Sequence, residues 1–185
     1  MNVRKINLTL VAIVLTIFCF AQSKLAPEKS TAQTQKSLAD SLFYPFKFIS
    51  LSEAEKIIGH PAHLKDSLRK FTEGYFRLQF TYRSNVKDSI KNTFGSLFFG
   101  FEQYPQTSGA TRAFSLIKAE NEKSNTLTMM NQLGDEGFLI NDQFNNPFIM
   151  IRKGNRIYKL RLVNVEGKTS ANDLQLLAKK IVSAY

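Results

Sequence analysis

The sequence predicts an α+β fold, an antiparallel sheet with helices packed on one face. Residues 75–83 alternate between apolar and polar side chains, as a half-buried strand does. Two further strand-like runs, 147–152 and 156–165, are joined through a Gly-Asn pair within residues 153–155, which is typical of a tight hairpin. Residues 108–121 repeat their apolar side chains at helical spacing, and such a helix needs a sheet face to cover.

The N-terminus has the three parts of a secretory signal peptide. Arg4 and Lys5 form a basic start, and residues 8–20 are apolar except for two threonines. Small residues occupy the −3 and −1 positions of a cleavage site after Ala21. The apolar run is shorter than the ~20 residues that span a bilayer, so a retained membrane anchor is the weaker interpretation. We expect residues 1–21 to be removed and the mature protein to be exported, to a periplasmic or an extracellular location.

Cys19 is the only cysteine, and it lies inside the predicted signal peptide. Lipidation at this cysteine is a further alternative, which the large Phe18 before it disfavours. After cleavage the mature chain would have no thiol, which excludes disulfides, thiolate metal sites and a cysteine nucleophile. Such a chain must be held together by packing alone.

The mature chain divides into a polar segment and a single domain. Residues 22–41 are rich in Ser, Thr, Gln, Ala and Lys, and Leu25 and Leu38 are their only large apolar residues. This segment cannot bury enough apolar surface to order itself and is expected to be a flexible tether. From residue 42 onward aromatic residues become dense, and residues 42–185 are expected to form a single α+β domain.

Helix signals mark the first and the last part of this domain. Ser50 or Ser52 can cap a helix that ends at Gly59, and Ser52 together with Glu55 fits a capping box. A second helix, at the C-terminus, has Ser170 as its expected N-cap. The expected buried stripe of this C-terminal helix consists of Leu174, Leu177, Ala178, Ile181 and Val182.

The middle of the domain is expected to be mostly sheet. Residues 63–71 fit either one face of a helix or a strand that leads into a turn at 72–74. The clean strand that follows the turn favours the strand. A polar loop at 84–92 is expected to lead to a strand at 93–104, and a short strand is expected at 137–141.

Five short motifs lie in this domain: LSEAEKIIG at 51–59, FTY at 80–82, LGDEGF at 133–138, IRKGN at 151–155 and LAKKI at 177–181. Together they resemble a loose group of small exported bacterial proteins of unknown function, whose fold is similar to the PsbP-like α/β sandwich. The resemblance covers residues 50–185, and it implies a fold. Members of the group are mostly uncharacterised or act as non-catalytic accessory proteins, so the resemblance implies no catalytic residue.

The charge of the chain points to an anionic partner. The sequence has 25 Lys and Arg residues against 15 Asp and Glu residues, a formal net charge of +10. Removal of residues 1–21 takes away two of the basic residues and none of the acidic ones, which leaves +8. Export argues against nucleic acid as the partner and favours an anionic envelope component or an acidic protein.

Five basic residues are the candidate ligand-binding residues. Alternation places Arg77 and Arg83 on one face of their strand, and Lys159 and Arg161 on one face of theirs. If these faces coincide on the uncovered side of the sheet, they form with Arg152 a positive surface. Such a surface could receive a phosphate, an acidic glycan, an acidic protein or a membrane surface. The plainer interpretation is a solvated face that keeps the protein soluble.

Metal chemistry is the alternative function. His60 and His63 are the only histidines, and with Asp66 they could hold a metal ion for a metal-assisted hydrolase. Pro61 lies between the two histidines and forces an extended backbone there, so they do not share one face of a helix. An exposed loop after a helix is therefore the favoured interpretation of this segment.

Other catalytic patterns find little support. Asp135 and Glu136 are neighbours at the start of a predicted strand, where adjacent side chains point to opposite faces and are not expected to converge on one substrate. The chain has no Gly-x-Ser-x-Gly motif and no glycine-rich phosphate loop. We therefore expect an exported accessory or binding domain of the cell envelope that is not an enzyme and carries no cofactor.

Overall fold

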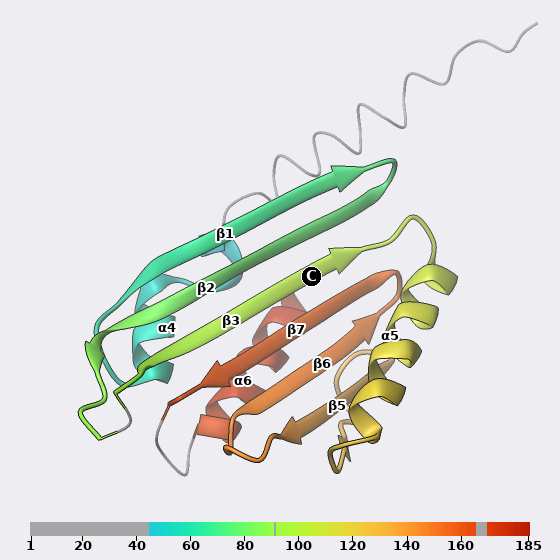
Figure 1. Cartoon of the computed structure of the whole chain (residues 1–185). Helices are drawn as coiled ribbons and strands as arrows, with labels where there is room; N and C mark the ends of the chain where they lie inside the picture. The colour runs from blue at the N-terminus through green and yellow to red at the C-terminus, as the bar shows by residue number, and fades with distance from the viewer. Residues whose placement is uncertain (1–44, 91, 166–169) are drawn as a thin grey trace, which may run out of the picture. The chain divides into compact units, whose positions relative to one another are not determined.

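The structure is a computed structural model that describes residues 45–90, 92–165 and 170–185 (Figure 1). The predicted signal peptide, residues 1–21, and the predicted tether, residues 22–41, lie outside the described residues. Within the described ranges, seven strands form one antiparallel sheet in the order β1-β2-β3-β7-β6-β5-β4. Helices pack on this sheet, which gives the α+β fold that the sequence predicts.

Strands make up most of the described chain. They are β1 (Ala62–Thr72), β2 (Tyr75–Lys87), β3 (Phe94–Gln103), β4 (Thr128–Met129), β5 (Glu136–Asn141), β6 (Pro147–Lys153) and β7 (Arg156–Val163). The helices are α3 (Pro45–Phe48), α4 (Leu51–Ile58), α5 (Thr107–Glu122) and α6 (Ser170–Ala184). The chain leaves β3 for α5, β4 and β5 and returns through β7, which pairs with β3 in the middle of the sheet.

Helices lie on both faces of the sheet, so the expectation that they pack on one face is wrong (Figure 1). The buried residues of α4 and α6 belong to one apolar cluster with Ile149 and Ile151 of β6. Phe114 of α5 belongs to a second cluster with Met150, which points to the opposite face of β6. Because residues 148–151 are apolar on both faces of the strand, both faces need cover.

The larger core lies between the sheet and the helices α4 and α6. β2, β3 and β7 each contribute alternate side chains to it, as the period of two predicts. The ring centroids of Phe80 and Phe99 lie 4.9 Å apart, and Phe48 of α3 also lies 4.9 Å from Phe99. The strand residues buried in this core are Phe76, Leu78, Phe80, Tyr82, Leu97, Phe99, Phe101, Tyr158, Leu160, Leu162, Ile149 and Ile151.

The segment 63–71, which fits a helix or a strand by sequence, is part of the strand β1. β1 turns into β2 through Glu73 and Gly74, which both have positive φ angles, 38° and 81°. Two consecutive residues with positive φ match the right-handed twist of the strands on either side. The favoured interpretation of this segment is therefore confirmed.

β2 is longer than the sequence predicts. It continues to Lys87, so the loop predicted at 84–92 begins later than expected. The polar residues remain in the strand because neighbouring strands still pair with it: Ala62 of β1 pairs with Ser84, and Phe94 of β3 pairs with Lys87. The Ser84 hydroxyl donates to the backbone carbonyl of Val86 at 2.8 Å, which keeps this buried polar group satisfied.

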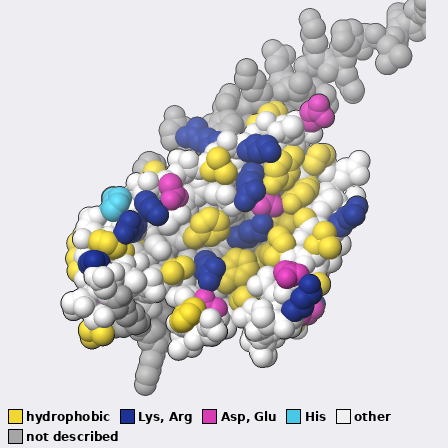
Figure 2. Space-filling model, in the orientation of Figure 1, with side chains coloured by type: hydrophobic (Ala, Val, Ile, Leu, Met, Phe, Trp, Pro, Cys, Tyr) yellow, Lys and Arg dark blue, Asp and Glu magenta, His cyan; other side chains and the backbone are white. Residues whose placement is uncertain are grey.

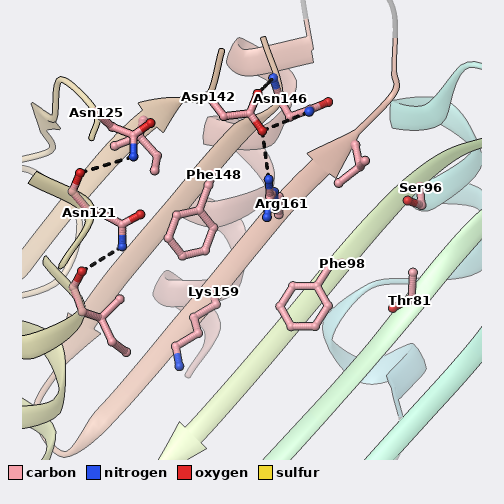
Figure 3. A pocket seen from close by; sticks show the side chains of 13 residues that line it. Thr81, Ser96, Phe98, Asn121, Asn125, Asp142, Asn146, Phe148, Lys159 and Arg161 are labelled. Atoms are coloured by element: carbon pink, nitrogen blue, oxygen red, sulfur yellow. Dashed lines mark hydrogen bonds and ion pairs between the residues drawn. The ribbon is translucent and has the colours of Figure 1, made fainter. Parts of the chain in front are cut away.

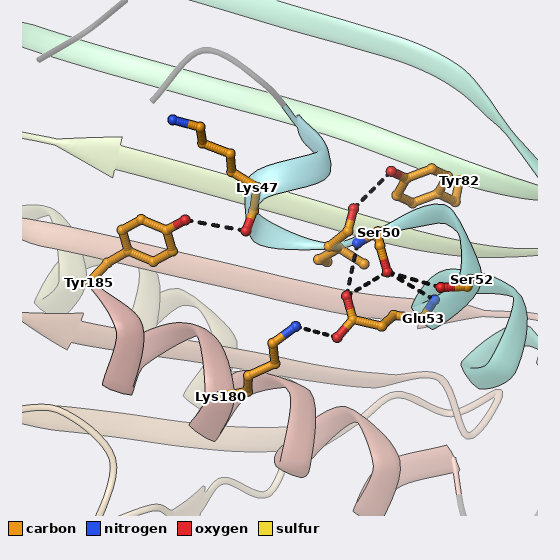
Figure 4. Close-up of polar contacts among 8 residues, drawn as sticks. Lys47, Ser50, Ser52, Glu53, Tyr82, Lys180 and Tyr185 are labelled. Carbon is orange, nitrogen blue, oxygen red and sulfur yellow. Dashed lines mark hydrogen bonds and ion pairs between the residues drawn. The ribbon is translucent and has the colours of Figure 1, made fainter. Parts of the chain in front are cut away.

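α4 begins at a capping box two residues before the predicted one (Figure 4). Ser50 is the N-cap, since its hydroxyl accepts from the Glu53 N–H and the Glu53 carboxylate accepts from the Ser50 N–H at 2.9 Å. Ser52 lies within the helix, so the predicted box of Ser52 and Glu55 is wrong. Gly59 ends the helix with a φ of 79°, in the left-handed conformation that the sequence predicts.

Polar contacts connect the start of α4 to the sheet and to α6 (Figure 4). The buried hydroxyl of Tyr82 in β2 donates to the carbonyl of Ile49 at 2.9 Å. Burial, and then the negative charge of Glu53, raise the pKa of Tyr82 to about 12, so this hydroxyl keeps its proton at neutral pH. Lys180 of α6 donates to the same Glu53. The capping carboxylate thus also holds two helices together.

The other long elements follow the prediction with small shifts at their ends. α5 and α6 contain the two predicted helices, and the predicted stripe of α6 is buried. The side chain of Ser170, the expected N-cap, lies outside the described residues. β6 and β7 form the predicted hairpin, in which Gly154 has a positive φ of 59° and Asn155 does not.

Two short elements are not predicted by the sequence. α3 has four residues, and β4 has two, which pair with β5. Both are too short to show a periodic pattern of apolar residues. Among the described residues, none of the helices combines the length and the apolar character that a membrane span requires.

Candidate functional site

α5 covers only part of its side of the sheet. Its buried residues Ala110 and Phe114 pack on side chains of β5, β6 and β7, and much of the sheet beyond them is uncovered. We call this uncovered part the open face; Figure 2 shows basic side chains over its middle, with hydrophobic side chains beside them. Its principal side chains are Lys70, Arg77, Gln79, Thr81, Arg83, Ser96, Phe98, Glu102, Lys159 and Arg161.

The strand register brings four of the five predicted basic residues to the open face. Arg77 and Arg83 of β2 point to the same side of the sheet as Lys159 and Arg161 of β7, because β3 pairs with both strands in register. Their strand faces therefore coincide, as the positive-surface hypothesis requires. The fifth residue, Arg152, is bound instead to Asp135 and Glu136.

Glu102 neutralises two of these cations. Its Oε1 accepts from Lys159 Nζ at 2.7 Å and lies 3.7 Å from Arg77 Nε, and its side chain is only 6% exposed. Its Oε2 accepts from the hydroxyl of Tyr104 at 2.8 Å. Burial and then this contact raise the pKa of Tyr104, which keeps the hydroxyl a donor. Arg77 and Lys159 are thus already paired with a carboxylate of the chain itself.

Asp142 neutralises Arg161 in the same way. The Asp142 carboxylate accepts from Arg161 Nη2 at 2.9 Å, and also from the side chain and the backbone of Asn146. Burial alone would raise the pKa of Asp142, but these donors and the Phe144 N–H outweigh it and hold the pKa below the usual value. Arg161 is thus also paired with a carboxylate of the chain.

Arg152 is held at a different place, at the ends of β5 and β6. Its Nη1 donates to Asp135 at 2.8 Å and its Nε donates to Glu136 at 2.8 Å. The expectation that these two carboxylates do not converge is therefore wrong. Asp135 precedes β5 and follows Gly134, whose φ of 70° turns the chain so that both acids reach one guanidinium. Arg152 is consequently not exposed to a ligand.

A groove crosses the open face beside α5 (Figure 3). It has a volume of about 600 Å³. Its floor follows one line of cross-strand neighbours, since each residue of this line is the partner of the next. With strands ~4.8 Å apart, the line is ~19 Å long. The residues of the line, from β2 to β5, are Thr81, Phe98, Arg161, Phe148 and Ile140.

The groove is mostly apolar in character. Lys159 and Arg161 direct their charged ends to Glu102 and Asp142, so they contribute mainly their alkyl stems to the groove. On the opposite wall, Figure 3 shows side chains from α5 and the segment after it. Asn121 Nδ2 donates to the Ile117 carbonyl, and Asn125 Nδ2 donates to the Asn121 carbonyl, which fixes both amides at the wall.

A second hollow, the basic pocket, adjoins the groove. It measures about 520 Å³ and shares the lining residues Thr81 and Ser96 with the groove, so the two hollows are neighbours. The guanidinium carbon of Arg83 lies 4.0 Å from the ring centroid of Phe94. None of the described residues that line this pocket is acidic. The lining residues are Lys65, Thr81, Arg83, Lys87, Asn92, Thr93, Phe94, Ser96 and Asn164.

The residues of the metal hypothesis do not form a metal site, although two of them lie beside the basic pocket: His63 pairs across the strands with Arg83, and Asp66 pairs with Thr81. His60 lies in the turn after α4, whereas His63 is in β1 and its Nδ1 lies 2.5 Å from Asn85 Oδ1. Asp66 follows a bulge in β1 and lies 3.9 Å from Lys65. Within the described ranges, no three His, Cys, Asp or Glu side chains are close enough together to hold a metal ion.

Two cations of the basic pocket are not among the residues that the sequence predicts. Lys87 falls in the segment that the sequence assigns to a loop, but an extended β2 places it on the same side as Arg83, four residues earlier. Lys65 reaches the pocket next to a β-bulge, and no alternation pattern predicts a bulge. One signal in the sequence indicates Lys87: the alternation of β2, when it is continued past residue 83.

The kind of ligand that the site can bind is inferred from the side chains of the site itself. Comparison of the chain with protein-family models, with curated proteins and with solved structures finds no match. The described arrangement offers cations, amides, hydroxyls and aromatic rings at fixed positions. These groups recognise a ligand by charge, hydrogen bonding and ring contact.

Proposed function

We propose that the chain is an exported, non-catalytic accessory domain of the cell envelope that binds an anionic ligand or partner on its open face. The basic pocket carries this proposal, because Lys65, Arg83 and Lys87 line one hollow without an acidic residue in its described lining. The signal-peptide pattern of residues 1–21 supports export. The motifs that resemble PsbP-like sandwich proteins support an accessory role.

The pairing of charges supports the basic pocket over the rest of the predicted surface. Arg77, Lys159, Arg161 and Arg152 each face a carboxylate of the chain within 4 Å, so a ligand must compete with that carboxylate. The same holds for Lys65 of the basic pocket, which lies 3.9 Å from Asp66, so the proposal depends on Arg83 and Lys87. Arg83 instead lies over an aromatic ring, which leaves its N–H groups available to an anion. The ligand's negative charge is therefore expected at the basic pocket.

A matched pair of charge-reversal variants tests the proposal. Arg83→Glu/Lys87→Glu changes the basic pocket, and Lys56→Glu/Lys179→Glu makes the same change of net charge on exposed positions of α4 and α6, across the sheet. In a crosslinking pull-down from the envelope fraction, we expect the first variant to capture at least tenfold less material than the wild type. The control variant is expected to capture as much as the wild type.

Equal capture by all three proteins, each shown to be folded by circular dichroism, would contradict the proposal. Equal loss in both variants would also contradict it, because a general effect of net charge would then explain the binding. Reversal of Lys159 is a poorer test, since it would leave the buried Glu102 beside a second carboxylate and unfold the protein for that reason.

A further inference from the structure

We propose that the groove and the basic pocket form one site for a single amphiphilic anion, with the anionic group in the basic pocket and an apolar body in the groove. This inference rests on the proposed anion-binding function and names the ligand class. Two hollows of opposite character that share a boundary are the observation behind it.

The boundary between the two hollows is short. Arg83 of the pocket pairs across the strands with Ser96, and Thr81 pairs with Phe98 of the groove floor. Arg83 and Thr81 are two residues apart on β2, which is ~7 Å along a strand. One molecule with an anionic group at Arg83 therefore places its next few atoms over Phe98.

The groove suits an apolar body. Phe98, Phe148 and Ile117 line it, and its two cations are each paired with a carboxylate, so little net charge remains there. Arg161 lies in the middle of the groove floor, and its charged end is held by Asp142, which also lines the groove. A second anionic group in this region would meet Glu102 or Asp142 and be repelled, whereas an apolar body avoids this repulsion.

The basic pocket suits an anionic group such as a phosphate monoester. Arg83 and Lys87 present charged donors from β2, and Lys65 adds a third from β1, with Asp66 as its nearby carboxylate at 3.9 Å. Thr93 also lines the pocket, and its buried hydroxyl oxygen has no hydrogen-bond partner among the described residues.

Three probes separate the two halves of the ligand. Titration calorimetry of the purified chain is carried out with octyl phosphate below its micelle concentration, with inorganic phosphate and with octyl glucoside. We expect octyl phosphate to bind with one-to-one stoichiometry and at least tenfold more tightly than either other probe. We expect Arg83→Glu/Lys87→Glu to weaken octyl phosphate binding at least tenfold.

A second matched pair tests the groove. Ile117→Asn changes a residue that lines the groove, and Leu116→Asn changes its neighbour, which is 63% exposed and does not line it. We expect Ile117→Asn to weaken octyl phosphate binding at least threefold and to leave inorganic phosphate binding unchanged. Leu116→Asn is expected to bind all probes as the wild type does.

Three outcomes overturn the inference. If inorganic phosphate binds as tightly as octyl phosphate and Arg83→Glu/Lys87→Glu abolishes both, the anion-binding function holds and the amphiphile is wrong. If the chain sediments with phosphatidylglycerol vesicles but does not bind monomeric octyl phosphate, the open face contacts a membrane surface instead. If no probe binds although the envelope pull-down succeeds, the ligand belongs to another class.

Discussion

The side chain of Glu102 determines which cations of the open face have no acid of their own. It lies under Arg77 and Lys159 and is almost fully buried, so it stays next to them in the folded protein. A count of Lys and Arg residues therefore overstates the positive charge that a ligand meets. The basic pocket matters because no described acidic residue lines it.

Removal of the lysine from this buried pair should destabilise the fold. We expect Lys159→Met to lower the free energy of unfolding by about 3 kcal/mol, because it leaves the buried carboxylate with Arg77 as the one cation beside it among the described residues. Lys159→Met/Glu102→Gln should recover most of this loss. Urea unfolding followed by circular dichroism measures both. A loss below about 0.5 kcal/mol in the single variant would show that Arg77 alone compensates Glu102.

Asp142 should make the stability depend on pH. Its pKa in the folded protein lies below the usual 3.8, so folding favours its ionised form. The stability that this gives is fully present above the unfolded pKa and is lost as the pH falls through the lower, folded pKa. We expect the loss of unfolding free energy below pH 4 to be smaller in Asp142→Asn than in the wild type. Parallel profiles in urea titrations at several pH values would count against this role.

At the scale of elements, local patterns predict the strands and helices, whereas long-range contacts decide their ends and sides. The alternation at 75–83 and the turn at Gly154 need only neighbouring residues, and both are confirmed. The extension of β2 to Lys87 depends on contacts with other strands: Ser84 pairs with Ala62 of β1, and Lys87 pairs with Phe94 of β3. The side of the sheet on which α5 packs depends on the second apolar face of β6, and a helix pattern does not contain that information.

The same limit applies to the candidate site. Alternation along each strand brings Arg83, Lys159 and Arg161 to the open face, as predicted. The ion pairs that remove Arg152 from the candidates join residues 16 and 17 positions apart, and spacing along the chain does not reveal them. Part of the site is therefore predictable from sequence, and its available charge is not.

The cap of α4 offers a test at this scale. We expect Ser50→Ala to lower the free energy of unfolding by about 1 kcal/mol, because it removes the hydroxyl that accepts from the Glu53 N–H. Ser52→Ala is the matched control at an exposed position within the helix and should change it by less than about 0.5 kcal/mol. Thermal unfolding of both variants measures the difference. A larger effect of Ser52→Ala than of Ser50→Ala would instead support the capping box of Ser52 and Glu55 that the sequence predicts.

At the scale of the whole described domain, protection should follow the position of each strand in the sheet. β3 and β7 are central, and their inner residues Leu97, Phe99 and Leu160 are fully buried. β1 and β4 are the edge strands, and most of β1 is exposed. We expect the slowest amide hydrogen exchange in β3 and β7 and the fastest strand exchange in β1 and β4. Exchange in β1 as slow as in β3, measured by mass spectrometry, would show that something covers this edge.

Because α5 covers only part of its side of the sheet, it leaves a site whose two ends differ in charge. In the groove, Lys159 and Arg161 are paired with the chain's own acids, Glu102 and Asp142, whereas the described lining of the basic pocket holds only positive and neutral groups. An elongated ligand with one anionic end is therefore expected to bind in a single orientation, with its apolar body in the groove beside α5 and its anionic end in the basic pocket.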